Sequence, residues 1–262
     1  PPTFGSTYQW NLSGGGVLNS GATTDNITVD WGVNPGTYTI TVTETDASGC
    51  IGLPITVDVT VDPLPTATVA TNQTACLGAT IPDLTAIGTN VTWYSDATLT
   101  NQLSVGNNFA TGQTNVGLYT YYVTESLNGC EGPSVPVTLE IYALPVVTAI
   151  ADQTICDGYA PSSLNASSAS AGTYSWVDAA DPLGIVLGTG SNFPPPPLTT
   201  STTYTVTFTE TSSGCTASDD VTITVTPLDD ATFTLTDYCE GSSNSATVTG
   251  TAGGVFTFTA PV

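Results

Sequence analysis

Residues 36–50, GTYTITVTETDASGC, hold the pattern on which the whole chain is built. Tyr38, Ile40 and Val42 alternate with threonines, which is the period of a β-strand that buries one face. The strand is followed by a short polar turn that ends in Gly-Cys. The same pattern returns as GLYTYYVTESLNGC at 117–130 and as TTYTVTFTETSSGC at 202–215. The final cysteines are 80 and then 85 residues apart (50 to 130, 130 to 215), which predicts a repeated unit.

This period divides the 262 residues into four parts. We expect a partial repeat at 1–64 that lacks its beginning, complete repeats at 65–144 and 145–228, and a partial repeat at 229–262 that lacks its end. Proline lies near each boundary, in DPLP at 62–65, ALP at 143–145 and PLD at 227–229. Because proline fixes φ and removes a backbone donor, these joints should be short and stiff.

Large aromatic residues recur at the same place in each part. Their spacings are 83, 83 and 82 residues, and they are Trp10, Trp93, Trp176 and Phe258. We predict one buried aromatic core position per repeat, since a large ring dominates a small core. Tyr38, Tyr119 and Tyr204 lie near the start of the recurring strand and are predicted to be core residues, each able to form a tyrosine corner. Short strands, frequent turns and no helical period predict an all-β fold of tandem immunoglobulin-like β-sandwich repeats of about 80 residues.

The composition excludes several classes of function. The chain has no Lys, Arg or His and 22 acidic residues, for a net charge of −22. It therefore has no side chain that could neutralise nucleic-acid phosphates or anionic lipid. It also has no histidine base and no lysine for a Schiff base, so we expect no enzymatic activity. No apolar stretch is long enough to insert into a membrane. The absence of Met and of a leader indicates an internal window of a longer, processed polypeptide.

The order of the motifs resembles a known kind of repeat. A Cys-x-Gly at 76–78 is followed by Trp93, the strand and turn at 119–130, and Leu-Pro at 144–145, and the series recurs from Cys156 to Cys215. It resembles the immunoglobulin-like and PKD-like tandem repeats of giant Bacteroidota cell-surface proteins, including gliding-motility adhesins. The resemblance implies an extracellular, cell-surface location and a role as stalk, spacer or adhesive surface. The implied partners are neighbouring repeats and other copies in a filament.

The six cysteines favour disulfides formed in an oxidising compartment. In the preferred scheme the pairs form within a repeat, Cys76 with Cys130 and Cys156 with Cys215, and Cys50 and Cys239 pair outside the sequence. A second scheme joins neighbouring repeats through Cys50–Cys76, Cys130–Cys156 and Cys215–Cys239. We prefer the first because the second requires 24–26 residues of extended chain and a stiff joint to fold back.

Two features could support binding. Carboxylates suit Ca²⁺, and the candidates are Asp178, Asp181, Asp229 and Asp230, with Asp219 and Asp220 beside them. No Asp-x-Asp-x-Asp loop is present, so we favour solvated acids and no cofactor. Trp31, with Tyr94 or Tyr142, could stack on sugars, although core packing is the simpler interpretation.

These observations predict a non-catalytic structural segment of a long extracellular fibre or cell-surface adhesin. The alternative is an adhesive module that binds glycans or a surface, either with or without calcium.

Overall fold

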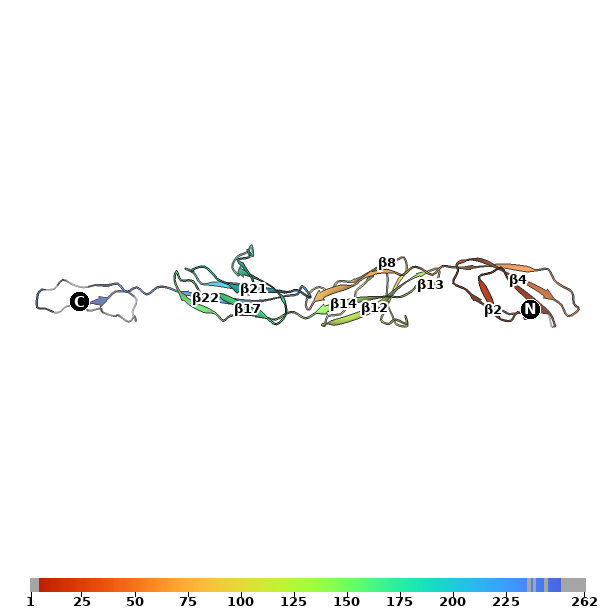
Figure 1. The fold of residues 1–262 in the computed structure, drawn as a ribbon, viewed down its shortest axis with the longest axis horizontal. Helices are drawn as coiled ribbons and strands as arrows, with labels where there is room; N and C mark the ends of the chain where they lie inside the picture. Colours follow the sequence, from red (N-terminus) through yellow and green to blue (C-terminus); the bar gives the residue numbers. More distant parts are fainter. Residues whose placement is uncertain (1–4, 235–236, 238, 243–244, 251–262) are drawn as a thin grey trace. The chain divides into compact units, whose positions relative to one another are not determined.

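The computed structural model describes residues 5–234, 237, 239–242 and 245–250. Every regular element among these residues is a β-strand, which confirms the predicted all-β fold. The chain forms two compact units, Pro1–Ile141 and Tyr142–Val262, and Figure 1 colours both by sequence.

The first unit begins with a three-stranded antiparallel sheet and a separate hairpin. The sheet has the order β1-β4-β5, and β2 pairs with β3. The strands are β1 (Thr7–Leu12), β2 (Gly16–Ser20), β3 (Thr28–Trp31), β4 (Gly36–Thr45) and β5 (Ile55–Val61). Trp10 of β1 lies opposite Val42 of β4, so the quoted stretch forms the middle strand of this sheet.

The rest of the first unit is a two-layer sandwich. One layer has the order β10-β9-β12-β14-β7, with β13 beside β12, and the other has the order β11-β8-β6. The strands are β6 (Val69–Thr71), β7 (Gln73–Cys76), β8 (Leu84–Ile87), β9 (Val91–Tyr94), β10 (Gln102–Val105), β11 (Asn108–Phe109), β12 (Gly117–Leu127), β13 (Cys130–Glu131) and β14 (Val135–Tyr142).

The second unit repeats the strand order of both layers, without a counterpart of β13. Its layers have the orders β19-β18-β21-β22-β16 and β20-β17-β15, and β16 runs parallel to β22. The strands are β15 (Val147–Ala149), β16 (Gln153–Cys156), β17 (Leu164–Ser168), β18 (Gly172–Asp178), β19 (Gly188–Thr189), β20 (Asn192–Phe193), β21 (Thr202–Glu210) and β22 (Thr216–Thr226). A further hairpin pairs β23 (Phe233–Thr234) with β24 (Thr247–Val248).

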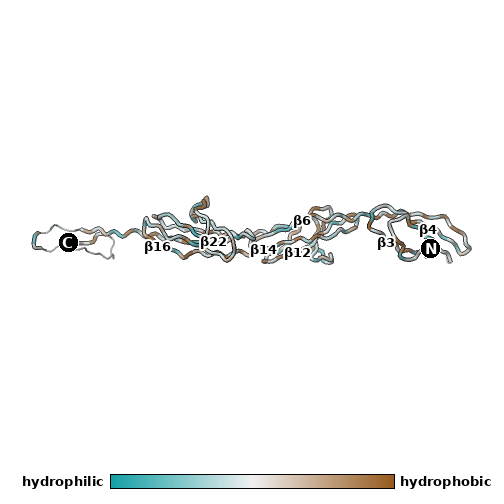
Figure 2. The backbone as a smooth tube through the Cα atoms, viewed as in Figure 1, coloured by the Kyte–Doolittle hydropathy of each residue, from teal (hydrophilic) through white to brown (hydrophobic). Residues whose placement is uncertain are grey.

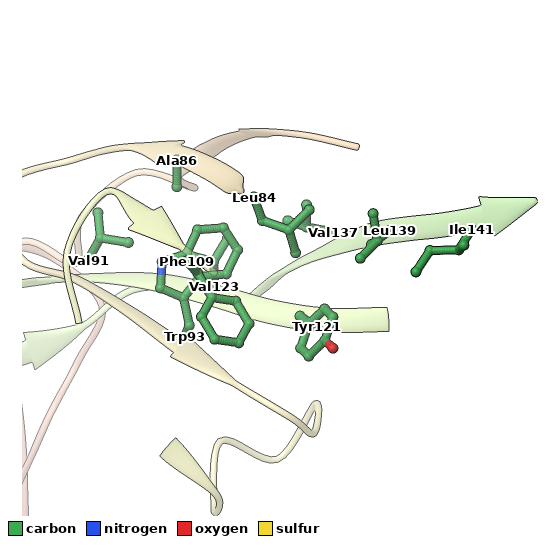
Figure 3. Packing of buried hydrophobic residues seen from close by; sticks show 10 residues of the cluster. All are labelled: Leu84, Ala86, Val91, Trp93, Phe109, Tyr121, Val123, Val137, Leu139 and Ile141. Atoms are coloured by element: carbon green, nitrogen blue, oxygen red, sulfur yellow. The ribbon is translucent and has the colours of Figure 1, made fainter. Parts of the chain in front are cut away.

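Each sandwich has its own buried core. In the first unit the apolar side chains of one core come from both layers, as Figure 3 shows for Leu84, Trp93 and Leu139. The second unit has the matching cluster, with Leu164, Trp176 and Ile223 fully buried. Because each core draws on strands of one sandwich alone, each sandwich buries its apolar faces by itself.

The alternating sequence explains the layers. In β14 every second residue from Val137 to Ile141 is buried, and the residues between them are partly exposed. Figure 2 shows hydrophobic and hydrophilic residues alternating along the tube of such strands. Threonine suits the solvent face of a strand because its hydroxyl is polar and its branched side chain favours extended backbone.

Glycine before the turn cysteine has a conformational reason. Gly49, Gly129 and Gly214 have φ values of 85°, 83° and 72°, in the left-handed region that glycine reaches at little cost. In the first of these turns the Gly49 amide donates to the carbonyl of Asp46 at 2.9 Å. The recurring Gly-Cys is therefore the end of a tight turn between two long strands.

Candidate functional site

The central tryptophans of the two complete sandwiches have equivalent surroundings. Trp93 lies opposite Val123 and Trp176 opposite Val206, and both indoles are fully buried. Each indole Nε1 donates to a backbone carbonyl, at 2.9 Å to Gly106 and at 3.0 Å to Gly190. The centroid of Trp93 is 5.5 Å from that of Phe109, and Trp176 is 5.9 Å from Phe193. These rings are packing residues and not ligand platforms.

The other two predicted aromatic positions differ. Trp10 occupies the equivalent register but is only partly buried, and its Nε1 donates to the carbonyl of Thr24 at 2.9 Å. Phe258 lies outside the described residues.

Two of the three predicted tyrosine corners form. The Tyr38 hydroxyl donates to the carbonyl of Asn34 and the Tyr119 hydroxyl to that of Asn115, both at 3.0 Å. These bonds run from the start of a long strand to backbone four residues upstream, which is the geometry of a tyrosine corner.

The prediction of a corner at Tyr204 is wrong. Val123 and Val206 each lie opposite the central tryptophan of their own repeat, so the two valines are equivalent positions. Tyr204, two residues before Val206, therefore corresponds to Tyr121 and not to Tyr119. Tyr204 accordingly packs edge-on against Phe193 in the core, as Tyr121 packs against Phe109. Burial, and then the nearby Asp178 carboxylate, raise the pKa of Tyr204.

The predicted disulfides within a repeat do not form. Cys130 and Cys156 have free thiols, as do Cys50 and Cys239, whereas Cys76 and Cys215 are disulfide-bonded. In the second unit Cys156 lies opposite Thr226, the last residue of β22, and Cys215 lies just before its first residue. Eleven residue steps of extended chain, about 36 Å, separate Thr226 from Cys215, and a disulfide requires Cα atoms about 4.4–6.8 Å apart. The second scheme also fails, since each of its pairs includes a free thiol.

Two of the carboxylates considered for calcium binding accept hydrogen bonds from backbone amides of their own loops. Asp178 Oδ1 accepts from the amide of Ala180 at 2.9 Å. Asp181 accepts from the amides of Ile185 and Leu183, which hold its pKa below its usual value.

Asp230 Oδ1 accepts from the Thr232 amide at 2.9 Å, and Asp229 is exposed. Asp219 Oδ2 accepts from the Ala149 amide at 2.7 Å, and Asp220 accepts from Thr205. Across the described residues, no three Cys, Asp or Glu side chains come together in a way that could hold a metal ion.

The aromatic residues considered for sugar stacking are engaged elsewhere. Trp31 stacks on Tyr38 with centroids 5.7 Å apart. Tyr94 is buried, and its hydroxyl donates to Glu131 Oε1 at 2.7 Å, so burial and then this bond raise its pKa. Tyr142, at the end of β14, is partly buried.

Two depressions on the described surface are open to solvent and differ in their linings. One of about 610 Å³ follows β18 and β19, and Tyr174 is the titratable residue in its lining. Another of about 320 Å³ is lined by Glu44, Asp46 and Cys50. Because the chain has no histidine, lysine or arginine, proton transfer in such a place would fall to carboxylates and to a cysteine thiol. In the part of the chain that the structure describes, no helix has the length and apolarity to cross a membrane.

Several solved structures match this chain at low identity and with TM-scores below 0.5. Fibronectin(III)-like modules of Clostridium thermocellum CbhA match at 16% identity and a TM-score of 0.37, over 61% of this chain and 91% of that one. Drosophila N-cadherin EC1-4 matches at 17% identity and a TM-score of 0.26, over 90% and 70%. An I-band fragment of titin matches at 11% identity and a TM-score of 0.36, over 86% and 89%. No curated protein matches the sequence.

A family model described as "Ig-like domain CHU_C associated" matches twice in succession, at residues 65–142 and 143–227. These matches cover more than half of the chain and confirm the resemblance to tandem immunoglobulin-like repeats. An origin in the Bacteroidota, which the resemblance implied, stays a prediction. The chain thus belongs to the CHU_C-associated Ig-like family, with two of its domains in tandem.

Proposed function

We propose that the chain is a non-catalytic structural segment of a long extracellular fibre or cell-surface adhesin. The observation that carries the proposal is the presence of two successive Ig-like domains, each with the same topology and its own closed core. A chain of self-contained cores gains length with each copy. When such a chain is stretched, each domain keeps its fold without support from the next domain.

The charge of the chain supports this role. A net charge of −22 with no cationic side chain provides no complementary patch for an acidic partner. Uniform negative charge keeps copies soluble and discourages side-to-side association. Threonine-rich strand faces are the surfaces through which copies could pack in a filament.

The chemistry of the acids also supports it. Asp96 and Asp181 accept hydrogen bonds from their own loops, and Glu210 accepts from Ser213 and Ser170. These bonds lower the pKa of each carboxyl group. A carboxylate with a lowered pKa is a poor general base and a poorer general acid at neutral pH. The family match adds to this, since Ig-like domains are typically structural modules.

Force spectroscopy on the complete chain under reducing conditions tests the proposal. We expect two separate unfolding events, each releasing roughly 80 residues or about 280 Å of contour length at ~3.5 Å per residue. Trp176→Ala should remove or weaken one event and leave the other unchanged. A single event that includes both domains would contradict the proposal.

A glycan array with and without calcium tests the competing adhesive role. The structural role predicts no selective binding in either condition. Selective binding that EDTA abolishes would support a calcium-dependent adhesive module instead.

A further inference from the structure

The loop between β18 and β19 carries a run of exposed aliphatic side chains. In Figure 1 this teal loop extends out of the sandwich beside the β21 label, and Figure 2 draws its tip in the brown of hydrophobic residues. The exposed fractions are 80% for Leu183, 57% for Ile185, 53% for Val186 and 47% for Leu187. A contiguous apolar group of this kind on a soluble protein usually marks a contact with a partner.

An aspartate at the base of the loop fixes its backbone. Asp181 Oδ1 accepts from the Leu183 amide and Oδ2 from the Ile185 amide, both at 2.9 Å. The Gly184 amide donates to the Asp181 carbonyl at 3.1 Å, and Gly184 has a φ of 60°, in the left-handed region. Because these bonds hold the backbone beneath the aliphatic side chains, a partner does not have to order the loop when it binds.

The first unit contains the same turn with a polar tip. Asp96 Oδ1 accepts from the amides of Thr98 and Thr100, both at 3.1 Å, and Leu99, at the place of Gly184, has a φ of 58°. Counted from the two aspartates, three polar residues correspond to three aliphatic ones: Thr98, Thr100 and Asn101 to Leu183, Ile185 and Val186. The turn forms with polar residues at these positions, so its own folding does not explain the aliphatic residues of the second unit.

An uncharged depression adjoins the loop within the second unit. It has a volume of about 610 Å³ and is lined by residues 172–175, Val186 and residues 189–191. β19 is the outermost strand of its layer, and residues 183–191 contain none of the prolines or charged residues that usually protect a sheet edge. We call residues 172–175 and 183–191 together the loop surface.

The charge of the chain indicates which partner fits the loop surface. The net charge is −22 with no cationic side chain, so two copies repel each other wherever their acids face one another. The loop surface has no charged residue, and none occurs in the sequence between Asp181 and Glu210. A cationic partner would be drawn to the acids and would find no charge to bind here. The loop surface of a second copy is uncharged and apolar in the same way, so it can approach without this repulsion.

We propose that the loop surface is a self-association site, in which the loop of each of two copies packs in the depression of the other. The contact is isologous, so both loops are covered at once about a two-fold axis. A standard interface uses roughly 20–30 residues on each side, and the loop surface has fewer, so a single pair of chains associates weakly. The inference rests on the proposed structural function and deepens it by naming the surface through which copies associate.

Sedimentation velocity of the complete chain, with reductant present, tests the proposal. We expect a reversible dimer that strengthens when NaCl is raised from about 50 to about 500 mM, because salt screens the repulsion between copies. A chain that stays monomeric at about 1 mM protein, or a dimer that weakens as salt is added, would overturn the proposal.

A matched variant is provided by the chain itself. Leu183→Thr, Ile185→Thr and Val186→Asn together give the loop the residues of the equivalent turn in the first unit, and should weaken dimerisation at least tenfold without lowering Tm. The control is Val146→Asn with Leu228→Thr, which removes two exposed aliphatic side chains of the same unit outside the loop surface. Equal weakening by the two variants would count against the proposal.

Photo-crosslinking locates the contact. With p-benzoylphenylalanine in place of Leu187, we expect a covalent dimer in which the label has reacted with residues 172–191 of the second copy. Chymotrypsin is used for the digest because trypsin has no Lys or Arg to cleave after. Cross-links mainly to other segments would show that copies associate elsewhere and would overturn the proposal.

Two further outcomes separate this inference from other interpretations. If the wild type binds phosphatidylcholine vesicles, the triple variant does not, and no dimer forms, the loop contacts lipid and the proposal is wrong. Absence of a dimer together with two unfolding events in the force experiment would overturn this inference and leave the structural function intact. A dimer together with a single unfolding event would contradict the structural function and support the self-association site.

Discussion

Trp93 and Trp176 each fill the centre of one sandwich, and their substitution should be costly. Removing a buried indole leaves a cavity and an unpaired carbonyl, so we predict that Trp93→Ala lowers the free energy of unfolding by about 3–5 kcal/mol. Leu118→Ala is the matched control, because Leu118 is largely exposed on a neighbouring core strand. Chemical denaturation followed by fluorescence measures both, and equal losses would contradict the core assignment.

The tyrosine corner can be tested by comparing the same Tyr→Phe substitution at two positions. Tyr119→Phe removes a hydrogen bond to the Asn115 carbonyl and should cost about 1 kcal/mol of stability. Tyr204→Phe should cost less, because the Tyr204 hydroxyl has no hydrogen-bond partner among the described residues. Thermal unfolding of the two variants compares them, and a larger loss for Tyr204→Phe would refute the register given above.

Asp96 should make a pH-dependent contribution to stability. Bonds from the Thr98 hydroxyl and the Thr100 amide lower its pKa from 3.8 to about 2. Because the folded-state pKa lies below the unfolded value, the contribution is complete above about pH 5 and is lost as the pH falls through 2.

Asp96→Ala should therefore lower Tm most near neutral pH, and the difference from wild type should shrink between pH 4 and pH 2. Comparing the two proteins at each pH cancels the change in overall charge repulsion. A difference in Tm that grows on acidification would be inconsistent with this assignment.

At the scale of elements, the long strands and their turns are where sequence reasoning is strongest. The alternation around Val42, Val123 and Val206 is regular, and each of these residues lies in a sheet opposite its repeat's tryptophan. The error at Tyr204 arose from counting back from the cysteine. Val123 precedes its turn cysteine by seven residues and Val206 by nine, so the third turn is two residues longer. Counting from the tryptophan would have given the correct alignment.

The disulfide error has a different cause. The sequence contains the motif Cys-x-Gly but not the direction in which its strand pairs. Because β16 runs parallel to β22, Cys156 lies at the far end of the repeat from Cys215. Strand direction depends on long-range pairing, which local alternation does not encode.

The turn glycine provides a test at the same scale. Gly214 has a φ of 72° and open space around it. The cost of alanine at this position would therefore come from backbone strain and not from a steric clash. We predict that Gly214→Ala costs about 1–2 kcal/mol, against little change for Thr211→Ala in the same exposed turn. Equilibrium unfolding under reducing conditions measures both, and a neutral Gly214→Ala would show that the turn has another conformation.

For the molecule as a whole, composition and period contained most of the available information. The repeat period and the recurring aromatic positions pointed to repeated sandwiches, and the two family matches at 65–142 and 143–227 agree with that organisation. What the chain contacts outside itself could not be read in the same way, because a ligand leaves no periodic pattern in a sequence.

Independence of the two domains is the central claim, and hydrogen–deuterium exchange of the reduced full-length chain tests it most directly. With Trp176→Ala, protection should fall throughout residues 143–227 and stay at the wild-type level throughout 65–142. Loss of protection that spread into 65–142 would contradict the account.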